Sequence, residues 1–339
     1  VAHVGEGEIL RGAGVRKPIL ILSETIPELL QGVVRGNFAQ TVYAEQFIEH
    51  LNTEAKRQGK QVAVHFKVDT GMGRVGARGE EIARILKAIS DASHLFLEGI
   101  YTHFARADEK DGLTTREQLS QFQQIVDTHK IPANVIRHAA NSAALLHFPD
   151  TQLDMVRVGL LLYGILPNAR HTPHELSPVL SLKTEVRYVK EVPAGSALSY
   201  GGTFVTSRPS RIATIPIGYA DGLPVRVSNR AKVLIRGRRF PIVGRVTMDM
   251  TLVDVTGDGV CVGDEVVVIG SQNGERITAE ELAGWAETIP YETVCGIGKR
   301  IPRMVVNENV FIPKVATAKL SRSNRPGADC SNAPKRVEV

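Results

Sequence analysis

The chain has 339 residues, 43% of them hydrophobic, which is enough to bury one large core or two medium ones. Its formal net charge is +5, but residues 314–339 hold six Lys or Arg against two Asp or Glu, so the rest is nearly neutral. With aromatic residues at only 5%, neither a basic stripe nor a stacking platform for nucleic acid is indicated.

The three cysteines, Cys261, Cys295 and Cys330, are widely spaced and odd in number. They fit neither a disulfide framework nor a zinc site, which favours a reducing compartment. No apolar run reaches membrane length, and no signal peptide opens the chain. We therefore expect a cytoplasmic protein with no metal, nucleic-acid or membrane partner.

The first half of the chain alternates short apolar runs with amphipathic segments of helix length. Strands are predicted at 1–4, 18–22, 40–44, 61–69, 98–104, 134–140 and 153–159. Helices are predicted between them, most clearly at 44–59, 79–90 and 114–130. This alternation is typical of parallel strands joined by helical crossovers. Seven strands are one short of a closed (β/α)8 barrel, and because the run 1–4 begins abruptly, we expect the first barrel strand to lie upstream.

From about residue 176 the pattern changes to β-branched runs separated by Gly and Pro turns. Strands are predicted at 182–192, 211–215, 231–237, 238–246, 250–256 and 263–270, with one helix at 278–289. We therefore expect a (β/α) barrel over 1–175 and a mostly antiparallel β domain over 176–313. A disordered basic tail is predicted over 314–339 from its polar composition.

Polar side chains follow four of the predicted barrel strands, at the carboxyl ends where barrels carry their chemistry. They are Lys67, Asp69 and Arg74; Thr102 and His103; His138, Asn141 and Ser142; and Arg157 and Gly159. Their convergence on one mouth favours a functional site over four unrelated clusters.

Each group also has a purely structural alternative. Lys67 could pair with Asp69, and either histidine could be a satisfied core residue. Ser142 could cap the helix that follows it, and Arg157 could pair with Asp154. These alternatives stay open on sequence alone.

The last two of these strands suggest a class of ligand. They end at 141–142 and 158–160, each before a predicted helix start. Backbone N–H groups there, with the Ser142 hydroxyl, form the phosphate cradle typical of barrels. Together with the preceding arginine, this cradle predicts a phosphorylated cofactor whose ring lies over the mouth.

Seven motifs, in this order along the chain, resemble the alanine racemase family: KVDTGMGRVG, YTHFARADE, HAANSA, MVRVGLLLYG, SYGGTF, IPIGYADG and GRVTMDM. The resemblance extends from Val1 to about Arg303. It implies a (β/α)8 barrel that binds pyridoxal 5′-phosphate, followed by a β domain, in a homodimer that acts on an amino acid. The implied product is D-alanine for peptidoglycan.

The resemblance also implies residue roles around the cofactor. Arg157 would face the pyridine nitrogen and His103 would lie against the ring. The phosphate would be held by Ser142, Gly159 and Leu160, with His138 and Asn141 as further cofactor-binding residues.

For the substrate, the resemblance implies that Arg74 and the Met248 backbone receive the carboxylate. Tyr219 would line the side-chain pocket, and Tyr200 would be the catalytic base, supplied by the partner subunit. Lys67 would be carbamylated, which would turn a clash with Arg74 into an ion pair.

The chain departs from the family pattern in three places. The family's K-A-x-A-Y-G-H-G motif, whose lysine attaches the cofactor covalently and serves as the second base, is absent from the 339 residues. Lys299 stands where a phosphate-contacting tyrosine is common, and Thr247 where a cysteine is common. We therefore expect a polypeptide of these residues alone to be inactive. A serine or broad-specificity racemase and a non-catalytic cofactor-binding remnant remain alternatives.

Overall fold

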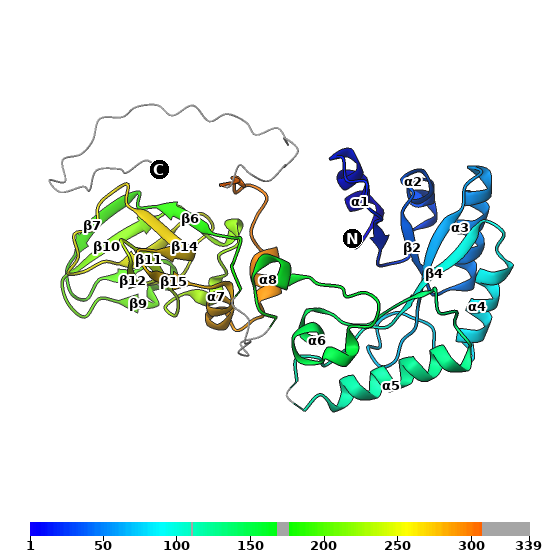
Figure 1. The fold of residues 1–339 in the computed structure, drawn as a ribbon. Helices are drawn as coiled ribbons and strands as arrows, with labels where there is room; N and C mark the ends of the chain where they lie inside the picture. Colours follow the sequence, from blue (N-terminus) through cyan, green and yellow to red (C-terminus); the bar gives the residue numbers. More distant parts are fainter. Residues whose placement is uncertain (110, 168–175, 307–339) are drawn as a thin grey trace. The chain divides into compact units, whose positions relative to one another are not determined.

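The computed structural model describes residues 1–109, 111–167 and 176–306. The boundary expected after residue 175 and the tail expected over 314–339 fall outside these described ranges. The chain divides into two compact units, Val1–Leu162 and Tyr163–Val339, which we call the barrel unit and the β unit. Figure 1 shows the elements of both, and each unit is described by itself below.

The barrel unit is built on a five-stranded parallel sheet whose strands lie side by side in chain order. They are β1 (Leu20–Ile21), β2 (Ala39–Val42), β3 (Val62–Lys67), β4 (Leu95–Tyr101) and β5 (Ile136–His138). A sheet that keeps chain order, with a helix in each crossover, is how a (β/α) barrel is built. The described strands thus form an open half-barrel, in agreement with the predicted fold class.

Helices occupy the crossovers between these strands (Figure 1). They are η1 (Pro27–Leu29) and α2 (Leu30–Arg35), α3 (Glu45–Arg57), α4 (Glu81–Asp91) and α5 (Leu113–Thr128). Helix α1 (Val4–Gly12) precedes β1, and α6 (Ser142–His147), η2 (Pro149–Thr151) and η3 (Leu160–Tyr163) follow β5. The apolar stripe of α3 shows why they pack: Phe47, Ile48, Leu51 and Ala55 are buried, at the spacing of one helix face.

Two of the predicted barrel strands are wrong. Residues 1–4 do not form a strand, because α1 begins at Val4 and the Glu6 carboxylate accepts the Ala2 N–H at 2.7 Å. Only Val1 bonds like a strand residue, donating to Leu20 O and accepting from Leu22 N, both at 2.9 Å. Residues 153–159 give one isolated bridge, between Met155 and His138.

Among its described residues, the β unit contains three antiparallel sheets, in the orders β13-β10-β7, β12-β11-β14-β15 with β6 beside β14, and β8-β9. The strands are β6 (Leu182–Glu185), β7 (Tyr188–Val192), β8 (Ala197–Leu198), β9 (Phe204–Val205), β10 (Ser210–Ile215), β11 (Lys232–Ile235), β12 (Arg238–Pro241), β13 (Thr251–Asp254), β14 (Glu265–Gln272) and β15 (Glu275–Ile277). This confirms the mostly antiparallel second half.

Short helices complete the β unit: η4 (Tyr200–Gly202), η5 (Tyr219–Asp221), η6 (Val225–Val227), α7 (Ala279–Ala286) and α8 (Pro290–Cys295). The predicted strand 182–192 is two strands, because the chain changes sheets at Val186 and Arg187. Val186 N donates to Asp264 O beside β14, and Arg187 N donates to Thr214 O on β10, both at 2.9 Å. No helix in the described parts of the chain is long and apolar enough to cross a membrane.

Candidate active site

Arg157 is the centre of the polar cluster at the carboxyl end of the parallel sheet. Its Nη1 lies 2.7 Å from His138 Nδ1, and its Nη2 donates to Thr102 O at 2.7 Å and to Ala139 O at 2.9 Å. Nη2 also lies 3.2 Å from His103 Nδ1. Burial lowers the pKa of Arg157 to about 10, so it remains a cation at neutral pH. The segments after β4 and β5 are thereby tied together by one side chain.

The alternative pairing of Arg157 with Asp154 does not form in the structure. The Asp154 carboxylate instead accepts the backbone N–H of Arg137 at 2.8 Å. Arg157 therefore has carbonyl and imidazole acceptors, and no carboxylate of residues 1–109, 111–167 or 176–306 pairs with its charge.

Both histidines beside Arg157 are held neutral. Burial, and after it the charge of Arg157, lower the pKa of His103 to about 3 and that of His138 to about 2. Because a guanidinium has only N–H donors, each ring must present an unprotonated Nδ1 to it and carry its hydrogen on Nε2. The site thus combines one fixed cation with two neutral imidazoles.

Tyr101, the last residue of β4, was not among the predicted site residues. Its ring stacks on that of His138, with centroids 4.6 Å apart and planes at 13°, and Arg157 Cζ lies 4.8 Å from its centroid. Its hydroxyl lies 3.0 Å from Thr41 Oγ1. An aromatic residue at a strand end carries no sequence signal that separates this role from core packing.

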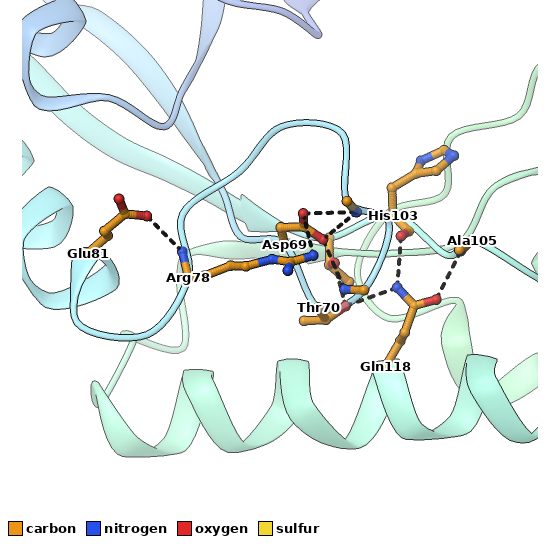
Figure 2. A network of polar contacts seen from close by, with 10 residues as sticks. Asp69, Thr70, Arg78, Glu81, His103, Ala105 and Gln118 are labelled. Carbon is orange, nitrogen blue, oxygen red and sulfur yellow. Dashed lines mark hydrogen bonds and ion pairs between the residues drawn. The ribbon is translucent and has the colours of Figure 1, made fainter.

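Lys67 ends β3 with its side chain buried, and the structure does not pair it with Asp69. Asp69 instead accepts the backbone N–H groups of Gly71 at 2.9 Å and Gly73 at 3.0 Å, and Arg78 Nη2 at 2.9 Å (Figure 2). Among the described residues Lys67 has no ion pair. Burial, followed by the charges of Arg74 and Arg157, lowers the pKa of Lys67 to about 8.

The loop that carries Arg74 is closed at its base. Asp69 N donates to Ala77 O at 3.0 Å, and Ala77 N donates to Lys67 O at 3.1 Å. Gly71 and Gly73 have φ of 139° and 71°, which a side chain would disfavour, so these glycines permit the turn. Arg74 itself is exposed.

Gln118 of α5 joins this loop to the segment that follows β4 (Figure 2). Its amide nitrogen donates to Thr70 Oγ1 at 3.3 Å and to His103 O at 3.1 Å, and its oxygen accepts Ala105 N–H at 2.9 Å. The His103 ring points away from this amide, so its backbone is fixed while its imidazole faces Arg157.

The predicted phosphate-binding residues lie where α6 and η3 begin. Asn141, not Ser142, is the N-cap of α6, accepting Ala144 N–H at 3.0 Å. Ser142 is buried, and its Oγ accepts Gly159 N–H at 2.9 Å, which leaves its hydroxyl hydrogen to donate elsewhere. The structure thus brings Ser142 next to Gly159 and Leu160, while Asn141 has a structural task.

The remaining predicted site residues belong to the β unit and are exposed: Tyr200 in η4, Tyr219 in η5 and Met248 before β13. Tyr219 N donates to Thr247 O at 3.0 Å, which places the Tyr219 turn against the Met248 loop. Arg300 spans the same two segments, donating to Asp221 and Asp249, both at 2.7 Å.

Comparison with known proteins gives a consistent result over both units. The family models "Alanine racemase, N-terminal domain" and "Alanine racemase, C-terminal domain" match residues 1–167 and 179–305. The chain is 45% identical over 312 residues to the alanine racemase of Halothermothrix orenii, covering 91% of this chain and 82% of that one. The chain belongs to the alanine racemase family.

Other alanine racemases give the same picture. The one from Symbiobacterium thermophilum is 46% identical over 314 residues, covering 91% of this chain and 83% of that one. The solved alanine racemase of Bacillus anthracis with bound L-Ala-P superposes with a TM-score of 0.84 at 36% identity, covering 91% and 81% of the two chains. Racemases of the family depend on pyridoxal 5′-phosphate, as the motifs indicated.

The fold is also shared by a racemase with another named substrate. The histidine racemase of Leuconostoc mesenteroides superposes with a TM-score of 0.82 at 30% identity, covering 90% of this chain and 83% of that one. Similarity of fold within the family therefore does not by itself select the amino acid.

Proposed function

We propose that this alanine racemase family member interconverts L- and D-alanine with pyridoxal 5′-phosphate, and that it supplies D-alanine for peptidoglycan from the cytoplasm. The observation that carries the proposal is the setting of Arg157. A guanidinium held by His138 and two backbone carbonyls at the carboxyl end of the sheet is a donor that cannot become an acceptor.

The residues present fit this cofactor. The structure gives Arg157 Nε no partner among the described residues, so an N–H remains for the pyridine nitrogen. His103 lies beside it with a neutral ring that can lie against a flat heterocycle. The hydroxyl hydrogen of Ser142 and the amide of Leu160 would hold the phosphate, with Gly159 close enough to Ser142 that the backbone can approach it.

When bound, pyridoxal phosphate supplies an electron sink that makes the Cα–H of the amino acid acidic enough to remove. The contribution of Arg157 is to hold its own proton. Since a guanidinium does not give up a proton at neutral pH, Arg157 would leave the pyridine nitrogen unprotonated and so would moderate the sink. A moderated sink would favour return of the proton to Cα over its transfer elsewhere, which is what a racemase requires.

Inversion at Cα needs proton-transfer groups on both of its faces. We propose Tyr200 of a second subunit as one of these groups, in a homodimer, because Tyr200 is 70% exposed in the β unit and has no carboxylate or imidazole partner among the described residues. Arg74 and the Met248 backbone would receive the substrate carboxylate, and Tyr219 would line the pocket for its side chain.

The other group, in the family, is the lysine of the K-A-x-A-Y-G-H-G motif. That motif is not within the 339 residues. We propose that a polypeptide of these residues alone can bind the cofactor but cannot racemise, because Tyr200 serves only one face. The same residues extended with the family's lysine motif should be active, and we call this extended polypeptide the completed chain.

The test is the production of D-alanine from L-alanine by the completed chain with pyridoxal phosphate, followed with D-amino-acid oxidase. L-Serine and L-histidine are assayed in parallel by chiral chromatography, since the notable alternatives are a broader racemase and a histidine racemase. Tyr200→Phe is the matched control, and we expect it to lower kcat by at least about a hundredfold. Equal or faster turnover of serine or histidine would overturn alanine as the substrate.

A further inference from the structure

Four polar side chains form a row from the candidate site across the parallel sheet. Arg157 Nη1 lies 2.7 Å from His138 Nδ1, His138 Nε2 lies 2.8 Å from His65 Nδ1, and His65 Nε2 lies 3.1 Å from Glu98 Oε2. His138 and His65 are buried, at 0% and 3% exposure. The row therefore begins at Arg157, passes through two buried imidazoles and ends at the Glu98 carboxylate.

The chemistry of the two ends fixes every hydrogen in the row. Arg157 can only donate, so His138 must accept at Nδ1 and carry its hydrogen on Nε2. His138 then donates to His65 Nδ1, and His65 in turn donates from Nε2. An ionised Glu98 can only accept, so it fits the last position. A donor-only end and an acceptor-only end thus select the same tautomer in both rings.

The backbone is shaped for this row at Glu98. The parallel pairing of β3 with β4 runs Val64 with Leu97 and then His65 with Gly99, so Glu98 is an extra residue without a partner on β3. Such a bulge re-aims a side chain and is enriched next to active sites. Gly99, opposite His65, leaves the space that the imidazole occupies.

Burial supports neutral rings along the row. It lowers the pKa of His65, against the opposing effect of Glu98, and lowers that of His138 to about 2. Glu98, by contrast, is 35% exposed and lines an open cavity of about 920 Å³ together with Gln61, Ala63 and Phe96. The carboxyl end of the row is therefore the end that water can reach.

We propose that Glu98 is a positioning residue for the racemase site, acting through His65 and His138 to hold Arg157 in place as a hydrogen-bond donor. The proposal rests on the proposed function only in assigning Arg157 to the pyridine nitrogen. Glu98 touches neither substrate nor cofactor. Its role is to terminate the row so that no ring can turn its Nδ1–H toward Arg157.

The first test reads the tautomers in residues 1–339 without cofactor or substrate. Selective ¹⁵N-histidine labelling, with His65→Gln and His138→Gln used for assignment, distinguishes Nδ1–H from Nε2–H rings by their ¹⁵N shifts. We expect both rings as neutral Nε2–H tautomers. An Nδ1–H or doubly protonated form of either ring at pH 7 would overturn the proposal. The measurement is made on the protein with its parent residues at all four positions of the row.

The second test replaces the hydrogen-bond acceptor at residue 98, the last position of the row, with a donor. Glu98→Lys puts a donor-only group there, whereas Glu98→Gln keeps an oxygen acceptor and is the matched control. The cavity beside residue 98 gives a lysine ammonium access to water, and thermal unfolding of each variant reports whether it is folded. We expect changed ¹⁵N shifts for His65 in Glu98→Lys and unchanged tautomers in Glu98→Gln.

In the completed chain, we expect Glu98→Lys to lower kcat for alanine at least about tenfold with KM nearly constant, and Glu98→Gln to retain most activity, as for outer residues that orient imidazoles. A folded Glu98→Lys protein with unaltered shifts and kcat would overturn the proposal. If the completed chain does not racemise alanine but shows the Nε2–H tautomers, the proposed function fails and the row stands.

Discussion

Gly99 leaves open the space in which His65 places its ring: a Cβ at residue 99 would lie 2.3 Å from His65 Nδ1. Real Cβ contacts are never this short, so a side chain here would force the imidazole away from both His138 and Glu98. The polar row that starts at Arg157 therefore requires a glycine at position 99 of β4.

The first prediction follows directly. Gly99→Ala should lower the free energy of unfolding by about 1–3 kcal/mol, the usual cost of inserting a methyl group into a packed interior. Urea unfolding monitored by circular dichroism measures it. Gly284 in α7 is the control, because a Cβ placed there meets nothing within 4 Å beyond its chain neighbours and its own helix backbone, and alanine should stabilise that helix by about 0.5–1 kcal/mol. Equal stability of Gly99→Ala and the parent would contradict the packing described.

The second prediction concerns the buried amine of Lys67. Its pKa of about 8 lies below that of an unfolded lysine, so the unfolded chain binds more protons between these two values. Stability should therefore rise with pH from about 8 to about 10, by about 1–3 kcal/mol, in protein kept free of carbon dioxide. Lys67→Met should remove that rise. If the free energy of unfolding changes with pH in the same way in Lys67→Met and the parent, the Lys67 amine is not desolvated.

A lowered amine pKa also favours carbamylation, because only the neutral amine reacts with carbon dioxide. The product is an anion that would pair with Arg74. We expect ¹³C-bicarbonate to give one carbamate carbonyl signal at neutral pH that is lost in Lys67→Met. Persistence of the signal in Lys67→Met would place the carbamate on another amine.

The third prediction tests the role given to Arg157. In the completed chain, Arg157→Glu would favour protonation of the pyridine nitrogen and strengthen the electron sink. We expect the ratio of pyruvate to D-alanine formed from L-alanine to rise at least about tenfold, as about 1.4 kcal/mol of altered partitioning implies. Coupling to lactate dehydrogenase measures pyruvate. Arg157→Lys keeps the positive charge and should stay near the parent ratio.

The fourth prediction uses the bridge made by Arg300 in the β unit. Arg300 donates to Asp221 beside Tyr219 and to Asp249 beside Met248, so it couples the two segments proposed to meet the substrate. In the completed chain, Arg300→Met should raise KM for alanine about threefold to tenfold with a smaller change in kcat, because binding rather than chemistry is disturbed. Arg300→Lys can reach one carboxylate and should recover part of the loss. A lowered kcat at constant KM would instead place Arg300 in the chemical step.

The sequence predicted a (β/α) barrel followed by a β domain because the periodicities of the two halves differ, but it predicted seven barrel strands where the structure describes five. Apolar stripes such as that of α3 and β-branched runs such as that of β14 are local signals. The split of 182–192 into β6 and β7 was not predictable, because it depends on Asp264 and Thr214, which lie far along the chain. The run 153–159 was overpredicted as a strand: Leu153 is exposed, and a single bridge from Met155 to His138 replaces a continuous ladder.

The candidate site shows a similar division. Its predicted residues at the strand ends, such as His138 and Arg157, are chemically distinctive in apolar surroundings. Tyr101 and Glu98 were missed because their roles depend on register: one on a stacked neighbour from β5, the other on a bulge between β3 and β4. Neither strand register nor a bulge can be recognised from a single sequence.

The loop from Asp69 to Arg78 has one more consequence. The Asp69 carboxylate accepts hydrogen bonds from Gly71, Gly73 and Arg78 (Figure 2). Thr70 accepts a further hydrogen bond from Gln118, which joins the loop to α5. Such a loop has already lost its conformational entropy before any anion arrives, so capture of a carboxylate by Arg74 incurs little further ordering cost. Variants that remove these hydrogen bonds should therefore shorten the residence time of a carboxylate inhibitor while leaving its association rate almost unchanged.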